Sequence, residues 1–174
     1  MSPTLHLPCG LPGAGKTTLA RRIEGEGPAL RLTGDEWLRA LFPQMTTHEA
    51  EFGPYRARIE KLQWKLAARA LDLGRDVVLD WGIWSRAERD LLRTGARRHG
   101  AKVALYFLDP PIEELWARVS RRNARADPGV FVMTRDDLIR WAGQFERPTA
   151  EELRQYDSCL ELPVTERDQG SGDE

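Results

Sequence analysis

Three glycines followed by a lysine and a threonine, close to the start of the chain, have the types and spacing needed to hold phosphate. Residues 10–17 read GLPGAGKT, the pattern Gly-x-x-x-x-Gly-Lys-Thr. Glycines let such a loop turn so that several backbone N–H groups point at one anion. Lys16 would add a positive charge at the β- and γ-phosphates, and the Thr17 hydroxyl is a typical Mg²⁺ ligand. The residues expected to form the site are Gly10, Leu11, Pro12, Gly13, Ala14, Gly15, Lys16, Thr17 and Thr18. The motif therefore predicts a site for the phosphates of ATP.

The residues on either side of this loop are those that a phosphate-binding loop needs. The preceding residues Thr4–Cys9 are short and mostly apolar, as in a strand, and Thr17–Ile23 has helical composition. A helix that begins at the loop would direct its positive N-terminal end at the same anion. Pro8 lacks a backbone donor, so we expect a missing sheet hydrogen bond or a bulge there.

An acidic residue closes the apolar run Asp76–Asp80 and is a candidate for the metal site. Carboxylates at the end of such a strand help to hold Mg²⁺ beside the threonine of the loop. Mg²⁺ keeps much of its hydration shell, so Asp80 would act through water molecules. The alternative is a solvated aspartate at a strand end. We predict that Thr17 and Asp80 form the metal site.

A second aspartate, Asp35, follows the strand candidate Ala29–Leu32 and opens a short helix candidate that Pro43 stops. As a helix N-cap, Asp35 would stabilise that helix by about 1 kcal/mol. As a catalytic group, it would orient an acceptor hydroxyl and accept its proton. The sequence leaves both roles open. Arg39 lies one helical turn later, where it would steady either Asp35 or an anionic substrate.

Arginines end the helix candidate Pro111–Arg122. Arg118 and Arg122 are four residues apart and share one helical face. The following residues, Asn123–Met133, are predicted to form a mobile loop, so the two arginines would lie on a lid that closes over the transferred phosphoryl group. The alternative is a solvated basic face paired with the acidic residues of the same helix.

Tryptophans follow the Asp80 strand directly, in the segment DWGIWS. In α/β folds, ligands bind beyond the carboxyl ends of the strands. We expect Trp81 and Trp84 to line a partly exposed acceptor pocket, although core packing is the alternative. Arg86 and Arg89 would bind an acceptor phosphate or lie on the helix surface. The other pocket wall is assigned to Trp37, Phe42, Phe52 and Tyr55.

Composition indicates one globular domain. The 174 residues carry a net charge of −1, and 41% are hydrophobic, which fits a single core and gives no general signature of a nucleic-acid binder. We expect a domain over residues 1–163 and a polar, frayed tail over 164–174. The sequence has no run of apolar residues long enough for a membrane helix and no signal peptide pattern, and its two cysteines lie far apart. These features favour a cytoplasmic protein.

Strand-like runs alternate with helical stretches along the chain. Further strands are expected at Asp76–Asp80, Lys102–Leu108 and Cys159–Leu162, and further helices at Pro54–Leu73, from Ser85 onward and at Thr134–Phe145. Serine and threonine capping boxes begin the last two helices. On the helix Pro54–Leu73, the apolar face is assigned to Tyr55, Ile59, Leu62, Leu66 and Leu73. Such alternation predicts a parallel sheet with helices on both faces.

Taken together, the segments GLPGAGKT, TGDEWLR, VVLDWGIWSRAERD and LWARVSRRN resemble the small P-loop kinases over about residues 3–162. The similar groups are the polynucleotide 5′-kinases, chloramphenicol phosphotransferase and the zeta-toxin-like AAA-type ATP-binding proteins. The resemblance implies a three-layer P-loop NTPase fold with a five-stranded parallel sheet, in which the Asp80 strand lies beside the P-loop strand. It also implies ATP with Mg²⁺ as the donor, Asp35 as the group that activates the acceptor, and Arg118 and Arg122 as lid arginines.

The acceptor is less well defined by the resemblance. Polynucleotide kinases carry an arginine three residues after the catalytic aspartate, where this chain has Leu38 and places Arg39 one position later. We therefore expect a kinase of a small hydroxylated molecule such as a nucleoside, an antibiotic or a sugar. A 5′-hydroxyl polynucleotide kinase is the alternative, and an ATPase or nucleotide switch that acts through a protein partner is the third. The sequence leaves the oligomeric state open.

Overall fold

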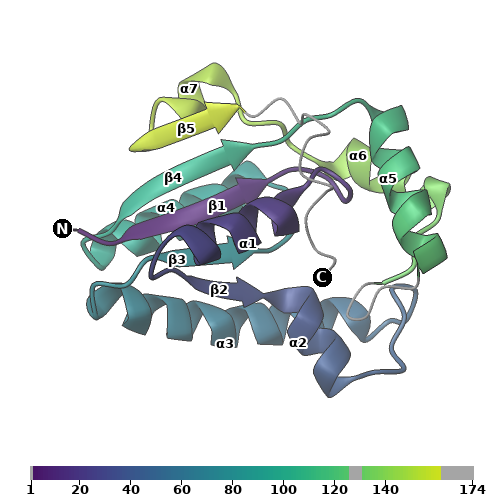
Figure 1. Ribbon diagram of the computed structural model, residues 1–174, viewed down its shortest axis with the longest axis horizontal. Helices are drawn as coiled ribbons and strands as arrows, with labels where there is room; N and C mark the ends of the chain where they lie inside the picture. The colour runs from purple at the N-terminus through teal and green to yellow at the C-terminus, as the bar shows by residue number, and fades with distance from the viewer. Residues whose placement is uncertain (1, 126–130, 162–174) are drawn as a thin grey trace, which may run out of the picture.

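One or more helices separate each pair of consecutive strands in the part of the chain that the structure describes. The computed structural model in Figure 1 describes residues 2–125 and 131–161. The elements are β1 (Thr4–Cys9), α1 (Lys16–Glu26), β2 (Leu30–Thr33), α2 (Gly34–Leu41), α3 (Phe52–Asp72), β3 (Val77–Asp80), α4 (Arg86–Arg98), β4 (Lys102–Phe107), α5 (Ile112–Arg125), α6 (Arg135–Gln144), α7 (Ala150–Leu153) and β5 (Ser158–Glu161).

The five strands form one parallel sheet in the order β2-β3-β1-β4-β5. This arrangement confirms the predicted fold class, with the Asp80 strand beside the P-loop strand. Because all strands run in the same direction, their carboxyl ends meet at one edge, on the right in Figure 1. The register of β1 with β4 runs through Pro8 without interruption, whereas its paired residues with β3 are Leu5 and His6. The expected bulge at Pro8 is therefore absent on the β4 side.

Helices cover both faces of the sheet, with α1 in front and α4 behind it in Figure 1. Strands covered on both faces bury side chains of both orientations, and all four residues of β3 are buried. The core contains leucines and valines of β1, β3 and β4 together with Leu19 of α1, Leu92 of α4 and Leu115 of α5. This packing holds the carboxyl edge of the sheet in place.

The buried face of α3 differs from the predicted one. Leu62, Leu66 and Leu73 are exposed, with 54%, 44% and 77% of their surface accessible. The buried residues are Ile59, which the prediction included, and Gln63, Ala67 and Leu71, which it did not; they are spaced by four. The prediction followed the largest apolar side chains, but the helix buries one glutamine and one alanine between Ile59 and Leu71. Gln63 is buried because it donates a hydrogen bond to the Thr33 carbonyl at 3.1 Å and accepts one from Trp81 at 2.7 Å.

The starts of α4 and α6 agree with the predicted capping boxes, but the end of α5 does not agree with the predicted loop. Capping boxes at Ser85 and Thr134 are both formed. The helix α5 continues to Arg125, so the segment expected to be a loop from Asn123 onward begins as helix. Residues 126–130 of that loop, Leu162 of the last strand and the predicted tail 164–174 lie outside the described residues.

A close contact between α3 and α4 yields a prediction. A Cβ atom at Gly95 would lie 2.5 Å from the Trp64 ring, whereas a Cβ at Gly25, in α1, would meet nothing within 4 Å. The clash in Gly95→Ala should cost about 1–3 kcal/mol, against a gain of about 1 kcal/mol in helix propensity. We expect Gly95→Ala to be less stable than the unmodified protein and Gly25→Ala to be more stable, as measured by urea unfolding. Equal shifts in both variants would contradict this account of the contact.

Candidate active site

The phosphate-binding loop has the backbone conformation that its glycines predict. Gly13 and Gly15 have φ angles of 83° and 99°, in the left-handed region, and α1 begins immediately afterward at Lys16. A Cβ atom at Gly13 would lie 2.9 Å from the Leu115 carbonyl oxygen of α5, and one at Gly10 would lie 2.3 Å from the Leu108 carbonyl oxygen. The loop therefore packs directly against the residue after β4 and the first turn of α5. A side chain at Gly10 or Gly13 would clash there.

The Lys16 side chain lies over the preceding residues of the P-loop. Its Nζ donates hydrogen bonds to the carbonyl oxygens of Gly10 at 2.9 Å and Leu11 at 3.0 Å. Burial lowers the pKa of Lys16, and the nearby carboxylates of Asp80 and Asp35 act in the opposite direction. The lysine therefore lies within electrostatic reach of both candidate acidic residues.

The structure brings Thr17 and Asp80 together, as the sequence predicts. The Thr17 hydroxyl donates to Asp80 Oδ1 at 3.2 Å. Asp80 is buried, and its Oδ2 has no hydrogen-bond partner among the described residues. Burial raises the pKa of Asp80, and Lys16 and the Thr17 hydrogen bond oppose that shift. A buried carboxylate oxygen beside a loop threonine suits a hydrated cation.

No group of three or more His, Cys, Asp or Glu side chains suited to hold a metal occurs within residues 2–125 and 131–161. This finding is compatible with Mg²⁺, which in kinase sites is held by one or two protein oxygens together with phosphate and water. The chemistry of the Thr17 and Asp80 oxygens fits that cation.

Arg31 is a charged neighbour of Asp80 that the sequence analysis did not identify. From β2, its guanidinium lies 3.6 Å from Asp80 Oδ2 and pairs with Glu24 and Glu36, each at 3.0 Å. Burial lowers the pKa of Arg31, but hydrogen bonds to the two glutamates outweigh this and raise it. Strand alternation predicts only that Arg31 and Leu32 point to opposite faces of the sheet. It does not show which residues Arg31 contacts.

Asp35 occupies the second position of α2 and is half-buried. The N-cap of this helix is Thr33, so the N-cap role considered for Asp35 is wrong. Two cations from other elements, Lys16 of the P-loop and Arg56 of α3, lie within electrostatic reach of this carboxylate. Asp35 therefore interacts electrostatically with both the donor loop and α3.

Arg56 is the second functional candidate that the sequence analysis missed. Its Nε donates to Glu60 Oε1 at 2.9 Å. Burial lowers the pKa of Arg56, but the charges of Asp35 and Glu60 outweigh it and raise that pKa. Burial raises the pKa of Glu60 despite Arg56. The only sequence signal was the four-residue spacing of Arg56 and Glu60, which is also common on solvated helices.

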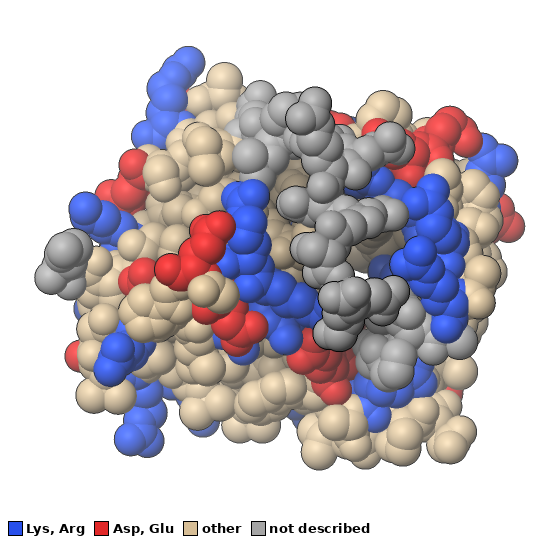
Figure 2. All heavy atoms as spheres, viewed as in Figure 1, with Lys and Arg blue, Asp and Glu red and all other residues tan. Residues whose placement is uncertain are grey.

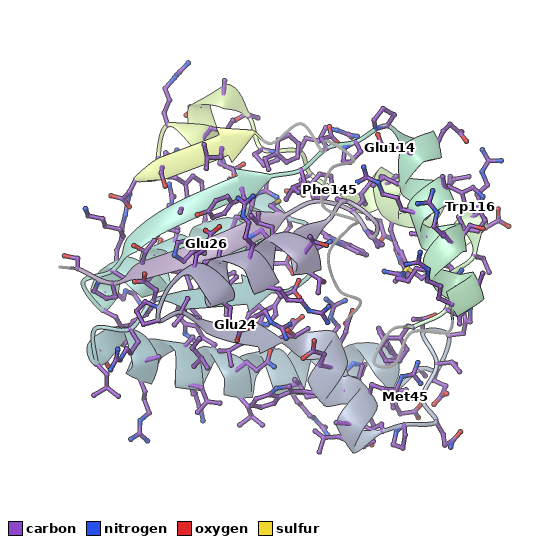
Figure 3. All side chains as sticks on the ribbon, in the orientation of Figure 1. Glu24, Glu26, Met45, Glu114, Trp116 and Phe145 are labelled. Carbon is purple, nitrogen blue, oxygen red and sulfur yellow. The ribbon has the colours of Figure 1, made fainter. Side chains whose placement is uncertain are left out.

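Arg39 contacts the segment after α2. Its Nη1 donates to the carbonyl oxygens of Pro43 at 2.8 Å and Met45 at 3.4 Å, and its guanidinium lies 4.3 Å from the ring centre of Phe131. Figure 3 shows Met45 in this segment. These contacts place Arg39 with the aromatic cluster of Phe42, Phe52, Tyr55 and Phe131. These contacts of Arg39 connect the segment after α2 with the aromatic cluster.

The two tryptophans after β3 have different environments. Trp81 is only 8% exposed, belongs to the core and donates to Gln63. The expectation that Trp81 lines an exposed pocket is therefore wrong, because α3 supplies a buried partner for its indole N–H. Trp84 is partly exposed and its ring lies beside that of Trp141, with centroids 5.7 Å apart. Trp37, assigned to the other wall, is exposed on α2.

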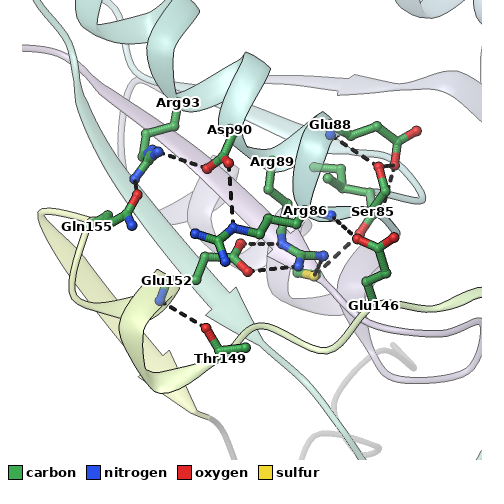
Figure 4. A network of polar contacts seen from close by, with 12 residues as sticks. Ser85, Arg86, Glu88, Arg89, Asp90, Arg93, Glu146, Thr149, Glu152 and Gln155 are labelled. Carbon is green, nitrogen blue, oxygen red and sulfur yellow. Dashed lines mark hydrogen bonds and ion pairs between the residues drawn. The ribbon is translucent and has the colours of Figure 1, made fainter.

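The predicted acceptor arginines of α4 also separate. Arg89 is fully buried and makes a two-bond ion pair with Glu152 at 2.6 and 3.0 Å (Figure 4), so neither role proposed for it holds. Arg86 lies near the surface, 3.7 Å from Asp90, and its backbone N–H donates to Glu146. Cys9 lies beside the Arg89–Glu152 ion pair, and burial raises the pKa of its thiol to about 11.

Arg118 reaches the P-loop from α5. Its Nη1 lies 3.4 Å from the Gly13 carbonyl oxygen, and its Nη2 pairs with Glu114, which Figure 3 places near the start of the helix. Arg122 contacts the Met133 sulfur at 3.4 Å. Figure 2 shows Lys and Arg side chains gathered over the position of α5. Arg118 therefore contacts the P-loop, whereas Arg122 contacts the segment before α6.

An open pocket of about 180 Å³ lies between α3 and the turn after β3. Glu60, on its α3 side, lies beside Gly34, the residue before Asp35. The pocket is lined by Gly53, Arg56, Ala57, Glu60, Gly82, Trp84 and Glu88. The pocket lies at the carboxyl edge of the sheet, and two of its lining residues, Arg56 and Glu60, are within electrostatic reach of Asp35.

Solved structures share this fold. A candidate kinase from Chloroflexus aurantiacus is 20% identical, with 98% of this chain and 93% of that chain covered and a TM-score of 0.72. A sugar kinase from Janibacter sp. HTCC2649 is 19% identical over 93% and 85%, with a TM-score of 0.64. A chain of the Pnkp1/Rnl/Hen1 RNA repair complex is 22% identical over 98% of this chain but 52% of its own length, with a TM-score of 0.67, so the present chain spans about half of that protein. At these identities the likeness establishes the fold.

No helix in the described part of the chain has the length and apolar character to cross a membrane. The sequence matches no curated protein. Residues 5–148, which include the P-loop, Asp35, Asp80 and α5, match the family described as AAA domain. The chain therefore belongs to the AAA domain family and has the fold of the P-loop kinases.

Proposed function

We propose that the protein is an ATP-dependent kinase that transfers the γ-phosphoryl group to a hydroxyl of a small molecule. The observation that carries the proposal is the position of Asp35. It lies within electrostatic reach of the P-loop Lys16 on one side and of Arg56, which lines the open pocket, on the other. A carboxylate between a phosphate site and a pocket is placed to receive the proton of an acceptor.

The chain's own residues account for each part of the transfer. The loop N–H groups and Lys16 hold the β- and γ-phosphates, and Lys16 offsets the charge that develops on them. An acceptor hydroxyl beside Asp35 gives up its proton to that carboxylate as its oxygen bonds to the γ-phosphorus. The bond from that phosphorus to the bridging oxygen breaks, and ADP leaves. Arg118, already at the Gly13 carbonyl, can turn toward the equatorial oxygens.

Mg²⁺ would be held by the Thr17 hydroxyl directly and by Asp80 through water. When bound, it neutralises charge on the β- and γ-phosphates. The buried Asp80 Oδ2, which has no hydrogen-bond partner in the described part of the chain, supports this assignment.

Asp80→Asn should weaken the response to Mg²⁺. An amide keeps the shape but removes the charge that orients the hydration shell, and loss of such outer-shell groups lowers metal affinity by about 10–100-fold. We expect the Mg²⁺ concentration for half-maximal ADP release to rise by that factor. Asp76→Asn, at the residue just before β3, serves as the matched control. An unchanged Mg²⁺ response in Asp80→Asn would remove Asp80 from the metal site.

The experiment that tests the proposed function is an ADP-release screen with Mg²⁺ and ATP. Acceptors are nucleosides, sugars, aminoglycosides and 5′-hydroxyl oligonucleotides, with Asp35→Asn as the control. ADP release that depends on one small acceptor, together with mass-spectrometric detection of the phosphorylated product, supports the proposal. ADP release that no acceptor stimulates would reject it.

Two other functions are tested by the same screen. The arginines on α5 and the likeness to a chain of an RNA repair complex favour a 5′-hydroxyl polynucleotide kinase as the second candidate. Label transfer from ATP to 5′-hydroxyl oligonucleotides, with small acceptors inactive, would establish it. An ATPase or switch would instead hydrolyse ATP in response to a protein partner and to none of the acceptors.

A further inference from the structure

Two hydrogen-bond donors converge above Gly82 in the open pocket. A Cβ atom at this position would lie 3.0 Å from Arg56 Nη2 and 3.0 Å from Trp84 Nε1. Both donors pack so closely on this glycine that any larger residue would have to displace at least one of them. Gly82 does not have a positive φ angle, so the glycine serves this close approach of the two donors rather than an unusual backbone conformation.

The Trp84 indole N–H is a buried donor in this pocket. Its Nε1 makes no hydrogen bond to any described residue. Burying a donor without a partner is costly, and native structures usually pair such a group with a ligand or water. A ligand oxygen in the pocket would accept from Trp84 Nε1 and from the Arg56 guanidinium.

Carboxylates dominate the rest of the pocket. Glu60 and Glu88 line it, and Asp35 lies within electrostatic reach of Arg56. The charge of Arg56 offsets that of Glu60, to which it is bonded at 2.9 Å. Among the lining residues, Glu88 then leaves one uncompensated negative charge. A phosphate or carboxylate brought close to these groups would be repelled in a site of reduced dielectric, whereas hydroxyl or ammonium groups would find acceptors.

We propose that this pocket selects acceptors without an anionic group: neutral or amine-bearing polyhydroxylated molecules, such as nucleosides, sugars and amino sugars. One oxygen of the acceptor accepts hydrogen bonds from Trp84 and Arg56, and hydroxyl or amine donors face Glu60 and Glu88. The inference rests on the proposed kinase function, and it makes Gly82 and Trp84 specificity-determining residues. The phosphorylated compound in the test below also represents the inner nucleotides of an RNA strand, which carry phosphate groups.

Matched compounds test the charge selection. Binding to the protein with Mg²⁺ and ADP is measured by saturation-transfer NMR and calorimetry for adenosine against adenosine 3′-phosphate, and for glucosamine against glucose and gluconate. We expect the anionic member of each set to bind at least 10-fold more weakly than its neutral or aminated partner. Equal or tighter binding of the anionic members, or no binding by any compound, would overturn the inference.

Two glycines provide matched variants, one in the pocket and one outside it. Gly82→Ala adds a methyl group 3.0 Å from each donor and displaces at least one of them, whereas a Cβ at Gly143 of α6, which does not line the pocket, would meet nothing within 4 Å. For the tightest compound, we expect Gly82→Ala to raise the dissociation constant at least 10-fold and Gly143→Ala to change it less than 2-fold. Trp84→Phe, which removes the N–H and keeps a ring, should weaken binding of the same compound. Unchanged ADP binding and thermal midpoints show that the variants are folded.

The outcomes separate this inference from the kinase proposal. If phosphoryl transfer occurs but Gly82→Ala and Gly143→Ala have equal KM values for the acceptor, the pocket assignment fails and the function stands. If compounds bind with the expected charge selection and Gly82 dependence but are never phosphorylated, the pocket assignment stands and the function fails.

Discussion

Replacing Asp35 with asparagine should lower kcat by about 10²–10⁴-fold, the usual contribution of a positioned general base. The amide retains the size of the side chain and can still orient a hydroxyl, but it cannot take up the proton. The P-loop is unchanged in this variant, so the affinity for ATP should stay within about 2-fold of the unmodified protein. Loss of kcat with ATP binding preserved would separate a catalytic role from a structural one.

The measurement is acceptor-dependent ADP release at saturating ATP, with nucleotide affinity determined by calorimetry. Asp136→Asn is the matched control, because Asp136 is an exposed residue in the first turn of α6, remote from α2 in sequence. The thermal midpoint of Asp35→Asn is also measured, because Arg56 loses a charged neighbour. Asp35→Asn protein that transfers phosphate at the unmodified rate would remove Asp35 from the mechanism.

Local patterns predicted the elements and the donor half of the site. The Gly-x-x-x-x-Gly-Lys-Thr segment, the buried strand that closes on Asp80 and the capping boxes all act over a few residues. Their structural consequences are therefore readable without knowing the fold. Parallel strands place their carboxyl ends together, so Thr17 and Asp80 were expected to meet although 63 residues separate them.

The acceptor half could not be predicted in the same way, because its contacts join elements that are distant in sequence. Arg56 resembles a surface residue of an exposed helix until the fold places it near Asp35. The Trp81 indole N–H has a buried hydrogen-bond partner in Gln63, whereas the Trp84 indole N–H has no partner among the described residues. On α3, apolar size misled the prediction, since the helix buries Gln63 and Ala67 while leaving Leu62 and Leu66 exposed.

Truncation of Glu152 should destabilise the protein by about 3–5 kcal/mol, the usual effect of removing one partner of a buried ion pair. Arg89 and Glu152 have no exposed side-chain surface, and their two hydrogen bonds connect α4 with α7 (Figure 4). In Glu152→Ala, the guanidinium stays buried without its carboxylate. Hydrogen bonds from Arg89 to the Trp84 carbonyl at 3.2 Å and to the Cys9 sulfur at 4.0 Å would remain, but these neutral groups cannot replace the lost charge.

Guanidinium unfolding measures this loss, and two comparisons give it meaning. Asp109→Ala breaks the exposed pair with Arg147, where a change of about 0–1 kcal/mol is expected because solvent screens the charges. The double variant Arg89→Met, Glu152→Leu removes both buried charges and should recover much of the stability, because apolar residues of similar size often replace such a pair without loss. A single-variant loss no greater than that of Asp109→Ala would show that the pair is open to water. A double variant as unstable as Glu152→Ala would instead assign the loss to packing, since no unpaired charge would then be left in the core.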